Sequence, residues 1–102
     1  MQLIAVHPYI KVERQVTRTE QIDTKHERMI YLYNEKIVTK YREFSIDQVK
    51  DMSYRRITGN KGLLYLHTSH GVYSYTVNTS PEAFIQKFKE TIQKRLGQNS
   101  AK

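Results

Sequence analysis

Residues 63–96 constrain the fold more than any other part of this chain. Two runs in this segment, residues 63–68 and 72–77, are rich in aromatic and β-branched side chains and are typical of strands. The three residues between them end at Gly71, which can adopt the left-handed backbone conformation that closes a short hairpin loop. The sequence therefore predicts a β-hairpin near the C-terminal end.

A helix is predicted directly after this hairpin. Ser80 is a good N-cap, Pro81 suits the first helical position, and Glu82 favours the positive end of the helix dipole. Apolar residues then recur every four positions, with Ile85 beside them, and form one stripe: Phe84, Phe88, Ile92 and Leu96. Such a helix is not stable alone, so we expect the stripe to cover an apolar opening in a sheet.

The rest of the chain reads as short strands and turns. Pro8 is expected to end the first strand or to confine it to a sheet edge. Asn34 and Glu35 are placed in a hairpin turn, residues 44–49 in a connector of one turn or a bent strand, and residues 58–62 in a loop. The predicted strands before the last hairpin are residues 3–6, 16–23 (the weakest pattern), 28–33, 36–42 and 50–57.

These elements predict a mainly β (α+β) fold with about seven antiparallel strands and one C-terminal amphipathic helix. A chain of 102 residues is expected to form one domain with one modest core, here residues 1–97. Gly97 is predicted to end the helix, and the polar residues 98–102 are expected to form a disordered tail.

Composition excludes several chemistries. The chain has no cysteine, which rules out disulfides, thiolate zinc sites and a thiol nucleophile. The first residues lack a basic region, and the apolar run stops at His7 and Pro8, so no signal peptide is expected. No segment approaches the roughly 20 apolar residues that cross a bilayer. We therefore expect a soluble, cytoplasmic protein.

The formal net charge of +7 makes this a basic protein. Its excess cations are spread over residues 28–58 and the C-terminal helix rather than gathered in one block. Lys94 and Arg95 have a structural explanation, because cations in the last helical turn complement the helix dipole. A solvated basic surface is the favoured interpretation, and anionic partners are the alternative.

Several motifs together resemble the small bacterial pleckstrin-homology-like proteins. They are Phe44-Ser45-Ile46-Asp47-Gln48-Val49-Lys50-Asp51, then Tyr54, Gly62-Leu63-Leu64-Tyr65-Leu66, Gly71-Val72-Tyr73-Ser74-Tyr75 and Ser80-Pro81-Glu82-Ala83-Phe84. The resemblance covers residues 28–96. It implies a partly open barrel of strands closed by the C-terminal helix, and bacterial members that bind proteins or peptides. Fold resemblance alone does not carry function.

Eukaryotic relatives that bind phosphoinositides use a K-x(n)-[K/R]-x-R pattern, and Lys36, Lys40 and Arg42 reproduce its spacing. If residues 36–42 form one strand, alternation places all three cations on one side, where they can converge on an anion. An edge strand protected from aggregation would carry the same charges. The candidate anion-binding set is Lys36, Lys40, Arg42, Arg55 and Arg56.

The eight tyrosines are the other conspicuous feature of the composition. Among those on predicted strands, core packing and cross-strand stacking of some of them are the favoured explanation: Tyr31, Tyr33, Tyr54, Tyr65, Tyr73 and Tyr75. Basic residues interleave with them, for example at Arg28, as on surfaces that bind single-stranded nucleic acid. No motif of a known nucleic-acid-binding fold supports that reading, so a nucleic acid is disfavoured.

No catalytic residue, metal site or cofactor is predicted. His67 and His70 lie across a turn without a third ligand at metal-binding spacing, and Asp47 and Asp51 are explained as well by surface capping. No nucleophile elbow or glycine-rich phosphate loop is present.

The favoured function is a non-catalytic binding module for a protein or peptide partner, with a homo-oligomer as one form of it. Strand edges, loops and the groove beside the helix are the expected contact surfaces. The first alternative is an anionic-surface binder with peripheral membrane contact. The second alternative is a single-stranded nucleic-acid binder.

Overall fold

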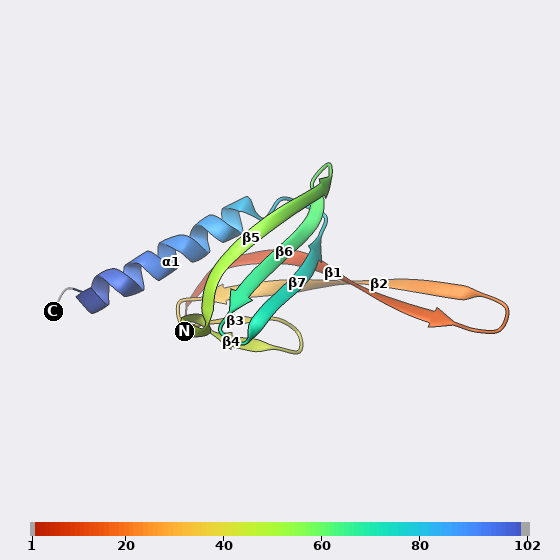
Figure 1. The fold of residues 1–102 in the computed structure, drawn as a ribbon, viewed down its shortest axis with the longest axis horizontal. Coiled ribbons are helices and arrows are strands. Elements are labelled where there is room, and N and C mark those ends of the chain that lie inside the picture. The colour runs from red at the N-terminus through yellow and green to blue at the C-terminus, as the bar shows by residue number, and fades with distance from the viewer. Residues whose placement is uncertain (1, 101–102) are drawn as a thin grey trace.

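The computed structural model describes the backbone of residues 2–100 and the side chains of residues 2–96. It shows one open, seven-stranded antiparallel sheet and one C-terminal helix (Figure 1), which confirms the predicted fold class. The strands are β1 (Leu3–Val16), β2 (Gln21–Tyr33), β3 (Lys36–Val38), β4 (Glu43–Ser45), β5 (Val49–Thr58), β6 (Lys61–Thr68) and β7 (Gly71–Val77); a 3-10 turn, η1 (Ile46–Gln48), precedes β5, and the helix is α1 (Glu82–Ser100). The strand order is β4-β3-β2-β1-β7-β6-β5.

The first two strands form one long hairpin that leaves the body of the protein. Their register runs from Leu3↔Tyr33 to Val16↔Gln21, and side chains over residues 11–25 are exposed. Figure 1 shows this β1–β2 arm projecting from the sheet, and the molecule measures 65 × 27 × 24 Å. The predicted strand over residues 16–23 is therefore wrong: these residues form the tip of the arm, where Thr17 N–H donates to the Glu20 carbonyl at 2.8 Å.

The prediction that Pro8 ends the first strand is also wrong, because β1 runs through it opposite Met29. Every second residue of an antiparallel strand directs its N–H away from the partner strand. On the side of β1 that faces away from β2, the described residues pair with β7 only at Ile10↔Thr76. A missing N–H at Pro8 therefore removes no ladder bond, which is the condition under which a strand accepts proline.

The predicted hairpin around Asn34 and Glu35 is confirmed, but its second strand is shorter than expected. β3 ends at Val38, and residues 39–42 form a turn in which Thr39 N–H donates to the Arg42 carbonyl at 2.8 Å. The side chain of Thr39 closes the same turn by accepting from Arg42 N–H at 3.2 Å. The connector over residues 44–49 contains one turn, η1, as predicted.

The C-terminal hairpin and the helix start lie where predicted, but the hairpin loop has two residues rather than three, because Gly71 is the first residue of β7. β6 and β7 pair without irregularity around the turn at Ser69 and His70, and Gly71 has a φ of 128°. Ser80 accepts a hydrogen bond from Glu82 N–H at 3.4 Å at the start of α1.

The helix closes the core by packing against β1 and β5, which lie on either side of β6 and β7 in the sheet. Phe84 and Phe88 are buried in a cluster that includes Ile30, Leu32, Ile37, Met52, Leu64 and Leu66. Two predictions for the helix end are wrong. Leu96 is 61% exposed, because the last turns of α1 extend beyond the sheet, and the helix continues past Gly97 to Ser100. Of the predicted tail, residues 101 and 102 lie outside the described residues.

Within the described part of the chain, α1 does not combine the length and the apolar character needed to traverse a bilayer.

Candidate functional site

The most distinctive surface of the protein lies where β1 and β7 separate. They pair at Ile10↔Thr76, and continuing that register would pair Val12 with Ser74, but the β1–β2 arm turns away before it can do so. The opening holds a cavity of about 420 Å³, which we call the β1–β7 cleft. It is lined by residues 9–12 of β1, residues 73–76 of β7, Arg28, Thr39, Tyr41 and Arg42.

Strand edges, rather than strand faces, border this cleft, since four consecutive residues of each strand line it. Thr68 and Gly71 flank a two-residue turn and so form a hydrogen-bonded pair, and such pairs alternate along an antiparallel ladder. The peptide groups of Val72, Ser74 and Thr76 therefore point away from β6. Thr76 meets Ile10, whereas no backbone hydrogen bond from the rest of the described chain reaches Val72 or Ser74.

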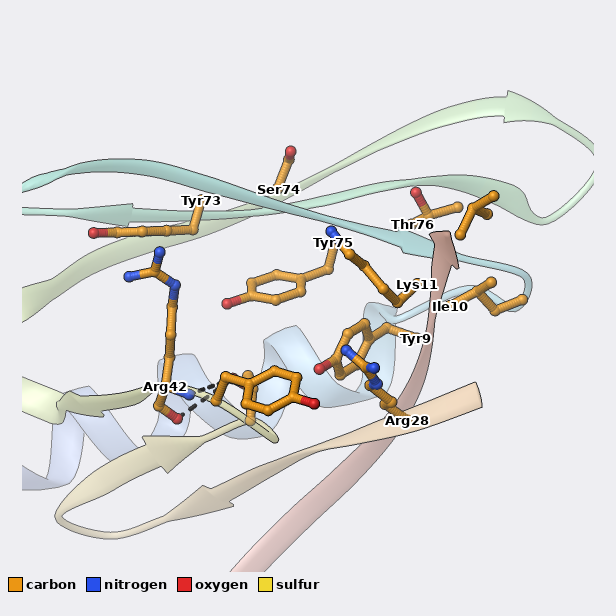
Figure 2. A pocket seen from close by; sticks show the side chains of 12 residues that line it. Tyr9, Ile10, Lys11, Arg28, Arg42, Tyr73, Ser74, Tyr75 and Thr76 are labelled. Carbon is orange, nitrogen blue, oxygen red and sulfur yellow. Dashed lines mark hydrogen bonds between the residues drawn. The ribbon is translucent and has the colours of Figure 1, made fainter. Parts of the chain in front are cut away.

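Aromatic rings form the floor of the cleft. Tyr9 is buried and meets Tyr75 edge-on, with ring centroids 5.0 Å apart. Burial raises the pKa of the Tyr75 hydroxyl, and a hydrogen bond with the Thr39 side chain acts in the opposite direction. Figure 2 shows Tyr73 and Tyr75 pointing into the cleft and Ser74 pointing away from it. Of the six strand tyrosines, Tyr75 meets Tyr9 of β1 and Tyr73 meets Phe44 of β4, so the prediction that some of them stack across strands is confirmed for these two.

Two guanidinium groups stand on opposite sides of these rings. The Arg28 Cζ lies 5.0 Å from the Tyr41 ring centroid, and the Arg42 Cζ lies 4.7 Å from that of Tyr73. Both geometries are cation–π contacts, which orient a guanidinium while leaving its edges free to donate.

The five cations predicted to bind an anion do not form one site. Lys36 bonds to Glu43 at 2.6 Å, and this hydrogen bond raises the pKa of Lys36. The expectation that Lys36, Lys40 and Arg42 share one side of a strand is wrong, because β3 ends before Lys40. Lys40 is exposed, with its Nζ 5.5 Å from the Tyr41 ring centroid, whereas Arg42 lines the cleft.

The remaining two predicted cations, Arg55 and Arg56, are exposed on β5 at one edge of the sheet. β6 and β7 separate that edge from the cleft. Of the predicted set, the structure therefore places Arg42 alone in the lining of the cleft, and it adds Arg28 and Lys11 from the β1–β2 hairpin.

Tyr9, Lys11 and Arg28 are absent from the predicted anion-binding set, and Arg28 was noted only among the basic residues that interleave with tyrosines. One signal could have found them. If residues 3–16 and 21–33 are read as a single hairpin, Tyr9 falls opposite Arg28, as the register shows. Pro8 obscured that pattern.

His67 and His70 each contact a nearby serine, and Asp47 contacts the C-terminal helix. His67 Nε2 lies 2.7 Å from Ser53 Oγ, and His70 Nδ1 lies 3.3 Å from Ser69 Oγ in the turn. Asp47 accepts hydrogen bonds from Arg95. Over the described residues, no three side chains of the metal-binding types come together.

No known family model and no curated protein matches this chain in sequence.

Proposed function

We propose that the chain is a non-catalytic interaction module that binds an extended segment of a partner protein along the free edge of β7. The observation that carries the proposal is the unpaired backbone at Val72 and Ser74, on the strand edge where Ser74 lines an open, aromatic cleft. An extended peptide placed there gains main-chain hydrogen bonds from the strand, and alternate side chains enter the cleft.

The other sheet edges carry features that discourage pairing. β4 is three residues long, and β5 exposes charged side chains at Lys50, Asp51, Arg55 and Arg56. Short and charged edges are common protections against strand addition. In contrast, β7 contains no charged residue in its sequence GVYSYTV. This difference supports β7 as the edge at which a partner strand is added.

The same proposal includes a pleckstrin-homology-like relationship, supported by the order of antiparallel strands followed by a C-terminal helix. A bacterial origin, a cytoplasmic location and self-association stay predictions. Binding of an anionic membrane or of single-stranded nucleic acid is less well supported, because the cations on which it was based lie on separate elements and Lys36 is paired with Glu43.

Displayed random peptides selected against the purified protein test this function. We expect selected peptides to bind and to shift the backbone amide signals of Val72 and Ser74 in NMR spectra. Ser74→Pro removes an N–H that points into the cleft and leaves the bonds to β6 in place, so it should abolish binding. Ser74→Ala is the matched control, because it removes the hydroxyl but keeps the N–H, and it should bind normally.

Thermal melting of both variants establishes that they are folded. Equal binding by folded Ser74→Pro, or amide shifts confined to α1, would place the partner elsewhere and reject the proposal. Retention on anionic liposomes or single-stranded DNA in place of peptide binding would favour the alternative classes.

A further inference from the structure

Arg28 is an unusual residue in the β1–β7 cleft because its side chain is largely buried while its one carboxylate contact in the described chain is long. Its side chain is only 10% exposed, and its Nε atom is buried with no hydrogen-bond partner in the described chain. The nearest carboxylate is Glu13, whose Oε1 lies 3.9 Å from Arg28 Nη2 and whose side chain is 57% exposed. Burying a guanidinium is costly unless its donors are satisfied, so this arrangement favours an external acceptor.

Arg42 faces the same space from the other wall. The hydrogen bonds between Thr39 and Arg42 fix its backbone, and Tyr73 orients its guanidinium. Arg42 makes no ion pair with a side chain in the described part of the chain. Lys11 adds a third cation to the lining, whereas none of the lining residues is an Asp or a Glu.

The cleft is therefore complementary to negative charge, and its preformed donors suit a carboxylate. Arginine donors bind carboxylates through short, charge-assisted hydrogen bonds, often two at once. We propose that Arg28 and Arg42 form a subsite for the acidic side chains of the strand that binds along β7. This inference rests on the proposed function and specifies the chemistry of its partner.

Strand geometry then dictates the spacing of the acidic residues. In a sheet, residues opposite one another on neighbouring strands project from the same face, and successive residues alternate between faces. Figure 2 shows Tyr73 and Tyr75 projecting toward Arg42, Tyr9 and Arg28. A strand beside β7 therefore directs every second side chain toward the two arginines. The recognised sequence is an extended segment with Glu or Asp at alternate positions.

Two capped peptides test the subsite, one of alternating threonine and glutamate and one with glutamine in place of glutamate. We expect the glutamate peptide to bind about tenfold more tightly in calorimetry, since hydrogen bonds to charged groups are stronger than neutral ones. Arg28→Gln and Arg42→Gln should each remove most of that preference. Arg55→Gln is the matched control, because it removes the same charge from the exposed β5 edge, and it should keep the preference.

Glu13→Gln gives a second measurement that does not depend on the stability of the arginine variants. It removes the carboxylate nearest to Arg28 and should strengthen binding of the glutamate peptide. A preference that persists in both arginine variants, or that falls equally in Arg55→Gln, would overturn the subsite. So would a failure of both peptides to bind, or retention on anionic vesicles that depends on Arg28 without peptide binding.

These experiments distinguish a failure of strand addition along β7 from a failure of the acidic subsite. If both peptides shift the Ser74 amide signal with equal affinity, strand addition along β7 stands and the acidic subsite is rejected. If the glutamate preference depends on Arg28 while the Ser74 amide is unaffected, the subsite stands and binding along β7 is rejected.

Discussion

Arg95 donates hydrogen bonds from its Nη2 to both carboxylate oxygens of Asp47, at 3.0 Å to Oδ1 and 3.3 Å to Oδ2. Its Nη1 also donates to the Asn34 carbonyl at 3.2 Å. One side chain of α1 thereby contacts both the turn between β2 and β3 and the connector before β5. Arg95, which the sequence analysis explained by the helix dipole, therefore also has a specific tertiary partner in Asp47.

We expect Arg95→Gln to lower the free energy of unfolding by only about 0.2–1 kcal/mol, because ion pairs in contact with solvent are strongly screened. Arg95 is about one-third exposed, and Asp47 is three-quarters exposed. Chemical denaturation measures the change, with Lys94→Gln as a control that removes the same charge one residue earlier. A larger loss would mean that this contact, rather than apolar packing, holds the helix on the sheet.

Phe88→Ala should cost far more, about 3–5 kcal/mol, because it leaves a cavity under the helix. Phe88 is 1% exposed at the centre of the core. Thermal and urea unfolding measure the loss of stability. A Phe88→Ala variant that is already unfolded at room temperature would also agree with the prediction. Gln93→Ala, at an exposed position of the same helix, should change stability by less than about 0.5 kcal/mol. Similar melting of Phe88→Ala and the native protein would show that α1 is peripheral to the core.

Gly62→Ala should destabilise the protein by about 1–3 kcal/mol through overpacking. Gly62 is buried at the start of β6, and a Cβ there would collide with the Arg55 carbonyl oxygen of β5 and lie 2.8 Å from Tyr54 Cε1. The obstacle is backbone, so the strand pair itself must shift. Lys61→Ala, at the neighbouring exposed position, is the control, and equal stability of the two variants would contradict the expectation.

Stability should fall as the pH drops below about 6.5, and His7 should contribute to that loss. Burial lowers the pKa of His7 in the folded protein, although its hydrogen bond with the Thr79 carbonyl acts in the other direction. The unfolded chain therefore takes up a proton at a pH where the folded chain does not, which favours unfolding. Below the folded pKa, both states are protonated and the effect levels off.

His7→Gln removes this titration while keeping a hydrogen-bond donor. The variant should show a flatter pH dependence of its urea midpoint between about pH 7 and pH 5 than the native protein. An unchanged slope in His7→Gln would show that other groups govern the acid response.

Local signals in the sequence predicted the fold well where they had few competitors. Ser80 favours the N-cap, Pro81 fixes its own φ, and Gly71 tolerates the positive φ of the turn, so the last hairpin and the helix start fall where expected. The long first hairpin was missed because proline usually ends a strand. Here β1 continues through Pro8, since the missing N–H lies on the side of β1 that faces away from β2. Leu96 was assigned to the core because periodicity cannot show where a sheet ends beneath a helix.

The candidate site was predicted less completely because it depends on contacts between distant segments. Arg42 was identified by its spacing from Lys40, but its aromatic partner Tyr73 lies on a different hairpin. Arg28 and Tyr9 come together through the register of β1 and β2. Nothing in the local sequence indicates that β1 and β7 separate after a single pair.

That single pair between Ile10 and Thr76 also bears on how the chain folds. β1 to β4 and β5 to β7 are each joined by short turns, so each set forms from contacts that are local in sequence. The β1–β7 junction and the packing of α1 on β1 and β5 are the steps that join them. Local pairing is fast and loop closure between distant segments is slow. We therefore expect two early meanders, with the rate of folding set by their docking under the helix.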